Sequence, residues 1–159
     1  MTIAGQMKLV AEALADWAKA NHGRVFIASD VLAAIDELRA RPGTPSVGLL
    51  FWSREPRGEL GITGRKDNHY KAVISRGRSL KIVSGESLTE GAAGGAPMFD
   101  LVEEAEDLVL SVRLPEEEGF GGEDLVPSHK GTGLFEVSGM VLDAYEINYS
   151  LPAQARVQL

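Results

Sequence analysis

Apolar residues recur at helical spacing in three parts of the chain. In the first part they follow one another at steps of four and three, which places them on one face of a helix: Ile3, Met7, Val10, Leu14 and Trp17. A second, short helix is expected after Ser29 or Asp30, since either side chain could cap it. The pattern predicts that its buried side holds Val31, Leu32, Ile35 and Leu38. The third helix is predicted over residues 98–113, between Pro97 and Pro115.

Shorter apolar runs between these segments predict strands. Residues 24–28 are partly β-branched and indicate a brief extended piece. Residues 46–52 (SVGLLFW) are apolar on both alternating faces, which is typical of an interior strand. A further strand is predicted over residues 70–75. Gly77 then marks either a bulge or a turn into another strand that ends at Val83.

Near the end of the chain, apolar residues occupy odd positions and polar residues occupy even ones. The apolar positions are Phe135, Val137, Val141, Tyr145, Ile147, Tyr149 and Leu151. This period of two predicts a strand with one buried face and one wet face, in which Glu146 and Asn148 are exposed. A two-residue turn at Ser138-Gly139 would place Phe135 opposite Leu142 and break the odd face. Either no turn lies there, or a bulge near Asp143 restores the face.

A length of 159 residues favours one domain, residues 1–159. Two long polar loops are expected at 53–69 and 114–130. Loops of such length in a compact domain are usually functional or mobile.

The composition narrows the class of protein. There are 23 acidic and 16 basic residues. The resulting net charge of −7 leads us to expect no sequence-specific nucleic acid among the partners, because contacts to phosphates need a basic surface. The absence of cysteine excludes disulfides and thiolate chemistry. No apolar stretch approaches the roughly 20 residues of a membrane helix, and no secretory signal opens the chain. These features lead us to expect a soluble, cytoplasmic protein without a membrane partner.

Motifs that carry chemistry are weak throughout. The three histidines, His22, His69 and His129, lack metal-ligand spacing, and surface positions are expected for them. The glycines at 91–95 precede a helix but lack the Lys-Ser or Lys-Thr of a phosphate-binding loop. No nucleophile motif of the GxSxG or SxxK type is present. We therefore expect no catalytic residue, no cofactor and no metal. A ligand-binding protein or enzyme with a site built from scattered residues remains the alternative.

One charge feature stands out from the acidic background. A basic segment holds Arg54, Arg57, Arg65 and Lys66. It is either ordinary solubilising charge or an electrostatic contact with an acidic neighbour. If the neighbour is another copy of this chain, the acidic side is expected on the third helix, at Glu103, Glu104 and Asp107.

The order of elements, together with "GRVF" after the first helix, "PSVGLLFW" and the closing "LDAYEINYSL", resembles the tail terminators of long-tailed bacteriophages. This family includes the lambda tail terminator. The resemblance implies an α+β fold with a mostly antiparallel sheet and two to three helices packed on it. It also implies a structural protein without cofactor that forms a homo-oligomeric, hexameric ring on the end of the tail tube. Its partners would be the tail tube protein and the head-connector or neck proteins. Its location would be the head-proximal end of the virion tail, after assembly in the host cytoplasm. The long loops and the glycine-rich insert leave a neighbouring neck protein as a second possibility.

Overall fold

The computed structural model describes residues 1–57, 65–79, 98–115, 125–136 and 142–153. Their elements follow in the order α1 (Ile3–Ala13), α2 (Ala15–Ala20), β1 (Arg24–Ile27), α3 (Val31–Ala40), β2 (Ser46–Pro56), β3 (Lys66–Ser79), α4 (Met98–Leu110), β4 (Ser128–Leu134) and β5 (Leu142–Pro152). The described strands form one five-stranded sheet in the order β1-β2-β3-β5-β4. Among these described strands only the β1–β2 pair is parallel, so the expected mostly antiparallel α+β fold is confirmed.

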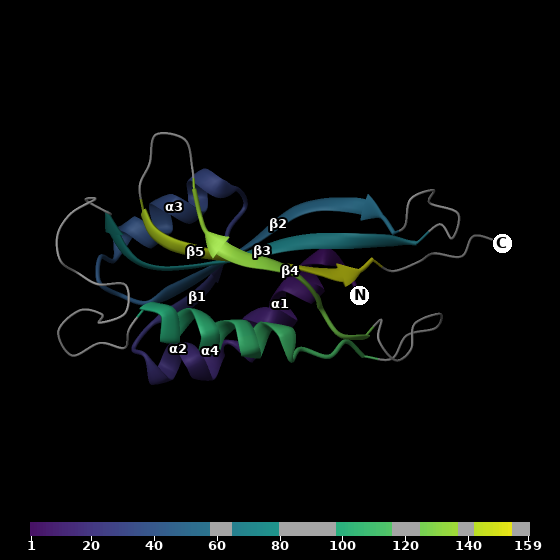
Figure 1. The fold of residues 1–159 in the computed structure, drawn as a ribbon, viewed down its shortest axis with the longest axis horizontal. Helices are drawn as coiled ribbons and strands as arrows, with labels where there is room; N and C mark the ends of the chain where they lie inside the picture. Colours follow the sequence, from purple (N-terminus) through teal and green to yellow (C-terminus); the bar gives the residue numbers. More distant parts are fainter. Residues whose placement is uncertain (58–64, 80–97, 116–124, 137–141, 154–159) are drawn as a thin grey trace.

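Helices cover both faces of the sheet, as Figure 1 shows. Helices α1, α2 and α4 pack on one face, which we call the α1/α4 face, and α3 packs on the other, the α3 face. The larger core lies under α1, α2 and α4, and a smaller one lies under α3. The odd residues of β5 (Tyr145, Ile147, Tyr149 and Leu151) all belong to the larger core, as the alternation predicted. Their even neighbours Glu146 and Asn148 are half-buried rather than exposed, because Lys71 of β3 reaches both.

Side-chain caps and one break define the helices. The Thr2 hydroxyl accepts from the Gly5 amide at 3.0 Å and starts α1. Leu14 separates α1 from α2, although the apolar face continues through it to Trp17. Asp30, not Ser29, caps α3 by accepting from the Ala33 amide. None of the helices in the described ranges is long and apolar enough to cross a membrane.

Two predicted helix details are wrong. Leu32 is 67% exposed, because the buried side of α3 is set by Ala34, Ile35 and Leu38 and leaves Leu32 facing away. Helix α4 ends at Leu110 rather than at residue 113. There the Ser111 hydroxyl donates to the Asp107 carbonyl, and the chain turns back to bury Val112.

Within the described part of the loop predicted at 53–69, most residues belong to strands. Residues 53–56 continue β2 and residues 66–69 begin β3, and the Arg57 amide donates to the Arg65 carbonyl at 2.8 Å. The charged residues indicated a loop, but cross-strand backbone bonds hold them in a long hairpin; residues 58–64 lie outside the described residues. The second predicted loop, 114–130, is also shorter, since 128–130 belong to β4. Its residues 116–124 lie outside the described residues.

The closing segment is two antiparallel strands and not one. Leu134 lies opposite Tyr145, and the Phe135 amide donates to the Ala144 carbonyl at 2.9 Å. Phe135 therefore does not lie opposite Leu142, as a two-residue turn would require. Its side chain packs in the core under α3, on the opposite face from the odd residues of β5. Ser138, Gly139 and the rest of 137–141 lie outside the described residues.

Gly77 marks a bulge in β3. The register of β3 against β5 shifts between Ser75 and Ser79, and Gly77 has a φ of +70°. A Cβ at this position would come within 2.1 Å of the Leu38 carbonyl oxygen, so the close approach of α3 also requires glycine. The bulge alternative is thus correct and the turn alternative is wrong. The predicted strand end at Val83 lies outside the described residues.

Candidate functional site at the end of the β2–β3 hairpin

The four basic residues singled out in the sequence lie together at one end of the sheet. Arg54 is on β2, Arg57 and Arg65 flank the strand ends, and Lys66 is the first residue of β3. We call this region, residues 53–57 and 65–69, the hairpin end; it lies at the end of the sheet where α1 begins (Figure 1). The acidic residues Glu103, Glu104 and Asp107 are exposed on α4, a separate element.

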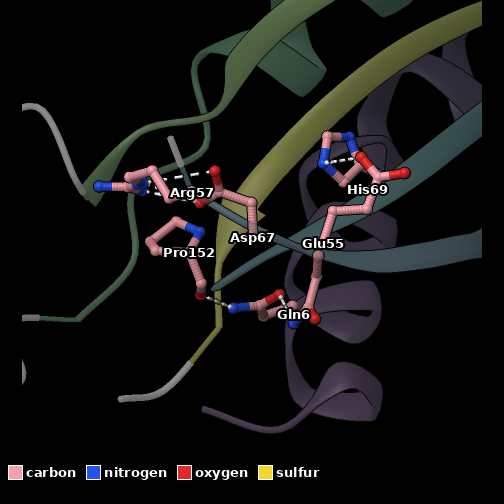
Figure 2. Close-up of polar contacts among 7 residues, drawn as sticks. Gln6, Glu55, Arg57, Asp67, His69 and Pro152 are labelled. Atoms are coloured by element: carbon pink, nitrogen blue, oxygen red, sulfur yellow. Dashed lines mark hydrogen bonds and ion pairs between the residues drawn. The ribbon is translucent and has the colours of Figure 1, made fainter. Parts of the chain in front are cut away.

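Arg54 and Arg57 bind partners within the hairpin itself. The Arg57 guanidinium pairs with Asp67 through Nη2–Oδ1 and Nε–Oδ1 distances of 2.8 and 3.1 Å (Figure 2). The Arg54 Nε donates to the Asn68 Oδ1 at 2.7 Å. The sequence did not indicate Asp67 as a partner of Arg57, because only the register of β2 against β3 brings the two side chains together. The hairpin end is therefore a mixed-charge surface, on which Glu55 and His69 form a further pair at 3.2 Å.

A buried glutamine ties the hairpin end to both termini of the fold. Gln6 of α1 is 1% exposed, and its Nε2 donates to the Pro152 carbonyl of β5 at 2.8 Å (Figure 2). Its Oε1 accepts from the Asn68 Nδ2 and from the Tyr70 hydroxyl, at 3.1 and 2.6 Å. Burial raises the pKa of Tyr70, which keeps its hydroxyl a neutral donor. No sequence signal marked Gln6, because a polar residue in an amphipathic helix is ordinary.

The network holds the hairpin end in one arrangement. A chain of hydrogen bonds runs from Arg54 through Asn68 to Gln6, and from Gln6 to the last residue of β5. Because every buried polar atom of Gln6 is bonded, displacing the hairpin would leave donors and acceptors unpaired. The site can therefore present fixed charges to a partner without first being ordered.

A shallow pocket lies beside the hairpin end on the α3 face. It has a volume of about 250 Å³ and is lined by residues that include Trp52, His69 and Lys130. The Lys71 ammonium lies 4.5 Å from the Trp52 ring centroid and donates to Glu146 and Asn148 at 2.7 and 2.8 Å. Lys71 is thus already held by its neighbours.

The remaining histidines lie elsewhere. His129 of β4 shares a hydrogen bond of 2.8 Å with Thr132, and Thr132 donates in turn to Glu106 of α4. His22 follows α2 with a φ of +52°. Among the described residues, no three histidine, aspartate or glutamate side chains come together in a group that could hold a metal ion.

No protein-family model matches the chain, and no curated protein matches it. The resemblance to tail terminators therefore rests on the order of elements and the three quoted stretches alone.

Proposed function

We propose that this chain is the subunit of a ring that caps a phage tail tube, as a tail terminator or a neighbouring neck protein. The ring would stop growth of the tube and present its other rim to the head connector. The observation that supports the proposal best is the hairpin end, a charged surface fixed at one end of the sheet by Gln6.

The position of the hairpin end suits an annular contact. Copies arranged around an axis that follows the strands would all place this end on the same rim of the ring. The exposed side chains there include Arg54, Glu55 and Lys66. Each rim charge pair is worth only about 0.2–1 kcal/mol, but the contact repeats in every copy of the ring. Charges of both signs fix orientation as well as attraction.

The anchoring of the hairpin end lowers the cost of binding. Ordering a loose charged loop at an interface costs about 0.5–1.5 kcal/mol for each immobilised side chain. Asn68 and Asp67 already hold Arg54 and Arg57, so much of that loss occurs during folding.

The test is a capping assay with the tube protein encoded by the same genome. Tube protein is polymerised with and without this chain, and tube lengths are measured by electron microscopy. We expect the wild-type chain to shorten tubes and to be visible at one end. The double variant Arg54→Glu with Lys66→Glu should lose capping, whereas Arg39→Glu, an exposed charge on α3, should retain it. Tubes of unchanged length with the wild-type chain would refute the proposal.

The alternative is a small ligand-binding protein or enzyme, and the pocket at Trp52 is the feature that favours it. Trp52 is 54% exposed, so its fluorescence reports directly on occupancy. Titration with a small-metabolite set should leave its emission unchanged if the ring proposal is correct. A saturable change that Trp52→Phe abolishes would favour the ligand-binding alternative.

A further inference from the structure

The sheet has two open edges in the described part of the chain, at β1 and β4. On β1, the Arg24 and Ala28 amides donate toward β2, to Pro45 and Leu49. Backbone groups alternate in direction along a strand, so those of Val25 and Ile27 point outward. On β4, the Phe135 amide donates inward to Ala144, which by the same alternation turns the groups of Thr132 and Leu134 outward.

The two edges carry matching apolar side chains on the same face of the sheet. Val25 packs against the core under α1, and Ile27 is 51% exposed two residues later. Leu134 is 53% exposed and lies opposite Tyr145, whose side chain is in that same core. A strand added at the β1 edge would thus bury Ile27, and one added at the β4 edge would bury Leu134; both side chains are now half-exposed.

An apolar groove adjoins the β1 edge. It has a volume of about 520 Å³, and its walls come from β1 and from one side of α1 and α2. The apolar lining is Ala11, Ala15, Ala18, Val25 and Ile27. The small alanine side chains leave room for a partner's side chains beside β1. Lys8 and Lys19 stand at the rim of this groove, with Glu12 between them.

The β4 edge is flanked by an acidic and aromatic side of α4. Phe99 is 40% exposed, and its ring meets that of Tyr145 at 5.8 Å. Glu106 accepts from Thr132 on β4 itself. Glu103 lies between Phe99 and Glu106 on this side of the helix, four residues after the first and three before the second. Helix α4 contains five acidic residues and no basic one: Asp100, Glu103, Glu104, Glu106 and Asp107.

We infer that the β4 edge of one copy pairs with the β1 edge of the next copy and extends the sheet from subunit to subunit. Strand β1 runs parallel to β2, and three successive antiparallel pairs then lead to β4. Strand β4 therefore runs opposite to β1, and two copies in the same orientation meet as an antiparallel pair. The register that matches faces sets Val25 opposite the partner's Leu134 and Ile27 opposite the partner's Thr132.

Charge supports a second copy as the occupant of the groove. The pairing places the acidic side of α4 against the partner's α1 and α2, where Lys8 and Lys19 line the groove. The sequence indicated the basic residues of the hairpin end as the contact for Glu103, Glu104 and Asp107. Two of those basic residues, Arg57 and Arg54, already bind Asp67 and Asn68.

The length of the free edge also fits. The register of β4 against β5 shifts between His129 and Gly131, so Lys130 lies at a bulge in β4. A lysine and a bulge on an edge strand both discourage pairing with a strand from another chain. Beyond it, residues 131–134 carry no charge and match the four residues of β1 in length. Because the two surfaces differ, the contact is head-to-tail, and copies joined this way form a ring when the rotation from one copy to the next closes on itself and an open filament when it does not.

This inference deepens the proposed function, since it names the contact that closes the ring, and it is tested without tail tubes. Ile27→Lys blocks the β1 edge and Leu134→Lys blocks the β4 edge; both residues are half exposed, so each variant should fold. Leu32→Lys, at a 67% exposed position on α3, is the matched control. Circular dichroism melts confirm folding, and sedimentation velocity gives the mass over a concentration series up to the solubility limit.

We expect wild type and the control to associate with rising concentration, and each blocked variant to remain a monomer. A one-to-one mixture of the two blocked variants should form a heterodimer and nothing larger, because each retains one intact edge. A wild-type chain that is monomeric throughout the series, a blocked variant that still assembles, or a mixture that stays monomeric would overturn the inference. Capping failure with intact rings would instead refute only the contact with the tube.

Discussion

Two stacked tyrosines, when each is replaced by phenylalanine, should change the free energy of unfolding in opposite directions. The rings of Tyr70 and Tyr149 lie 5.4 Å apart with an interplanar angle of 24°, and both side chains are almost fully buried. The Tyr70 hydroxyl donates to Gln6 at 2.6 Å. The Tyr149 hydroxyl is buried with no hydrogen-bond partner among the described residues. Replacing either by phenylalanine removes one oxygen and keeps the ring.

The expected changes in the free energy of unfolding differ in sign. A buried, unpaired hydroxyl costs about 1–3 kcal/mol, and removing it leaves a void the size of one atom that costs a few tenths of a kcal/mol. Tyr149→Phe should therefore stabilise the fold by about 1 kcal/mol. Tyr70→Phe should destabilise it by about 1–2 kcal/mol, because Gln6 loses an accepted hydrogen bond inside a buried network.

Urea denaturation followed by circular dichroism measures the difference. With an m-value of about 2 kcal/mol/M, the two variants should differ by about 1–1.5 M in midpoint, with wild type between them. Equal destabilisation by both substitutions would show that the Tyr149 hydroxyl has a partner in the folded protein, and the account of this core would be wrong.

Three further outcomes are expected. Ile147→Ala should cost about 2–5 kcal/mol, because Ile147 is fully buried, whereas Asn148→Ala should cost only about 0.5–1.5 kcal/mol through its bond to Lys71; equal effects in urea titrations would contradict the face assignment. Gly77→Ala should cost well over about 1 kcal/mol, since a Cβ there meets the Leu38 carbonyl, and an unchanged melting temperature would contradict the bulge geometry. Burial raises the pKa of Tyr149, so the unfolded chain loses this phenol proton at a lower pH than the folded protein does, and the free energy of unfolding falls as pH rises above the unfolded-state value of about 10. Tyr149→Phe should reduce this alkaline fall in the free energy of unfolding by up to about 1.4 kcal/mol per pH unit. An unaltered slope would count against burial of Tyr149 in the folded state.

Local patterns predicted the elements of this fold better than their pairing. The alternation at Tyr145, Ile147 and Tyr149 identified a buried strand face, because side chains alternate strictly along any strand. Phe135 was assigned to that same face, but it lies across the sheet, since a chain reversal separates it from β5 and resets the face. A one-residue change of register flips every side chain, and sequence alone did not set the register here.

The candidate site shows the same limit. Arg54, Arg57 and Lys66, which the sequence singled out together, share one end of a hairpin, while their role in an assembly contact stays a prediction. The sequence did not reveal that Asp67 neutralises Arg57, because that pairing depends on the β2–β3 register. The open edges at β1 and β4 were also beyond sequence reasoning, since strand order in a sheet is set by long-range packing.

Disulfide trapping tests the ring most directly. The chain contains no cysteine, so introduced cysteines can bond only with one another. Val25→Cys and Leu134→Cys in one chain place thiols on opposite edges of the sheet, where they cannot meet within a subunit. In the inferred pairing they face each other across the interface at about 5.5 Å between Cα atoms, which a disulfide spans. Mild oxidation should give one discrete covalent oligomer with no free thiol on a denaturing gel, while neither single-cysteine variant should form a covalent cross-link. Open ladders that retain free thiols, covalent dimers of either single variant, or no cross-linking at all would contradict a closed ring of this kind.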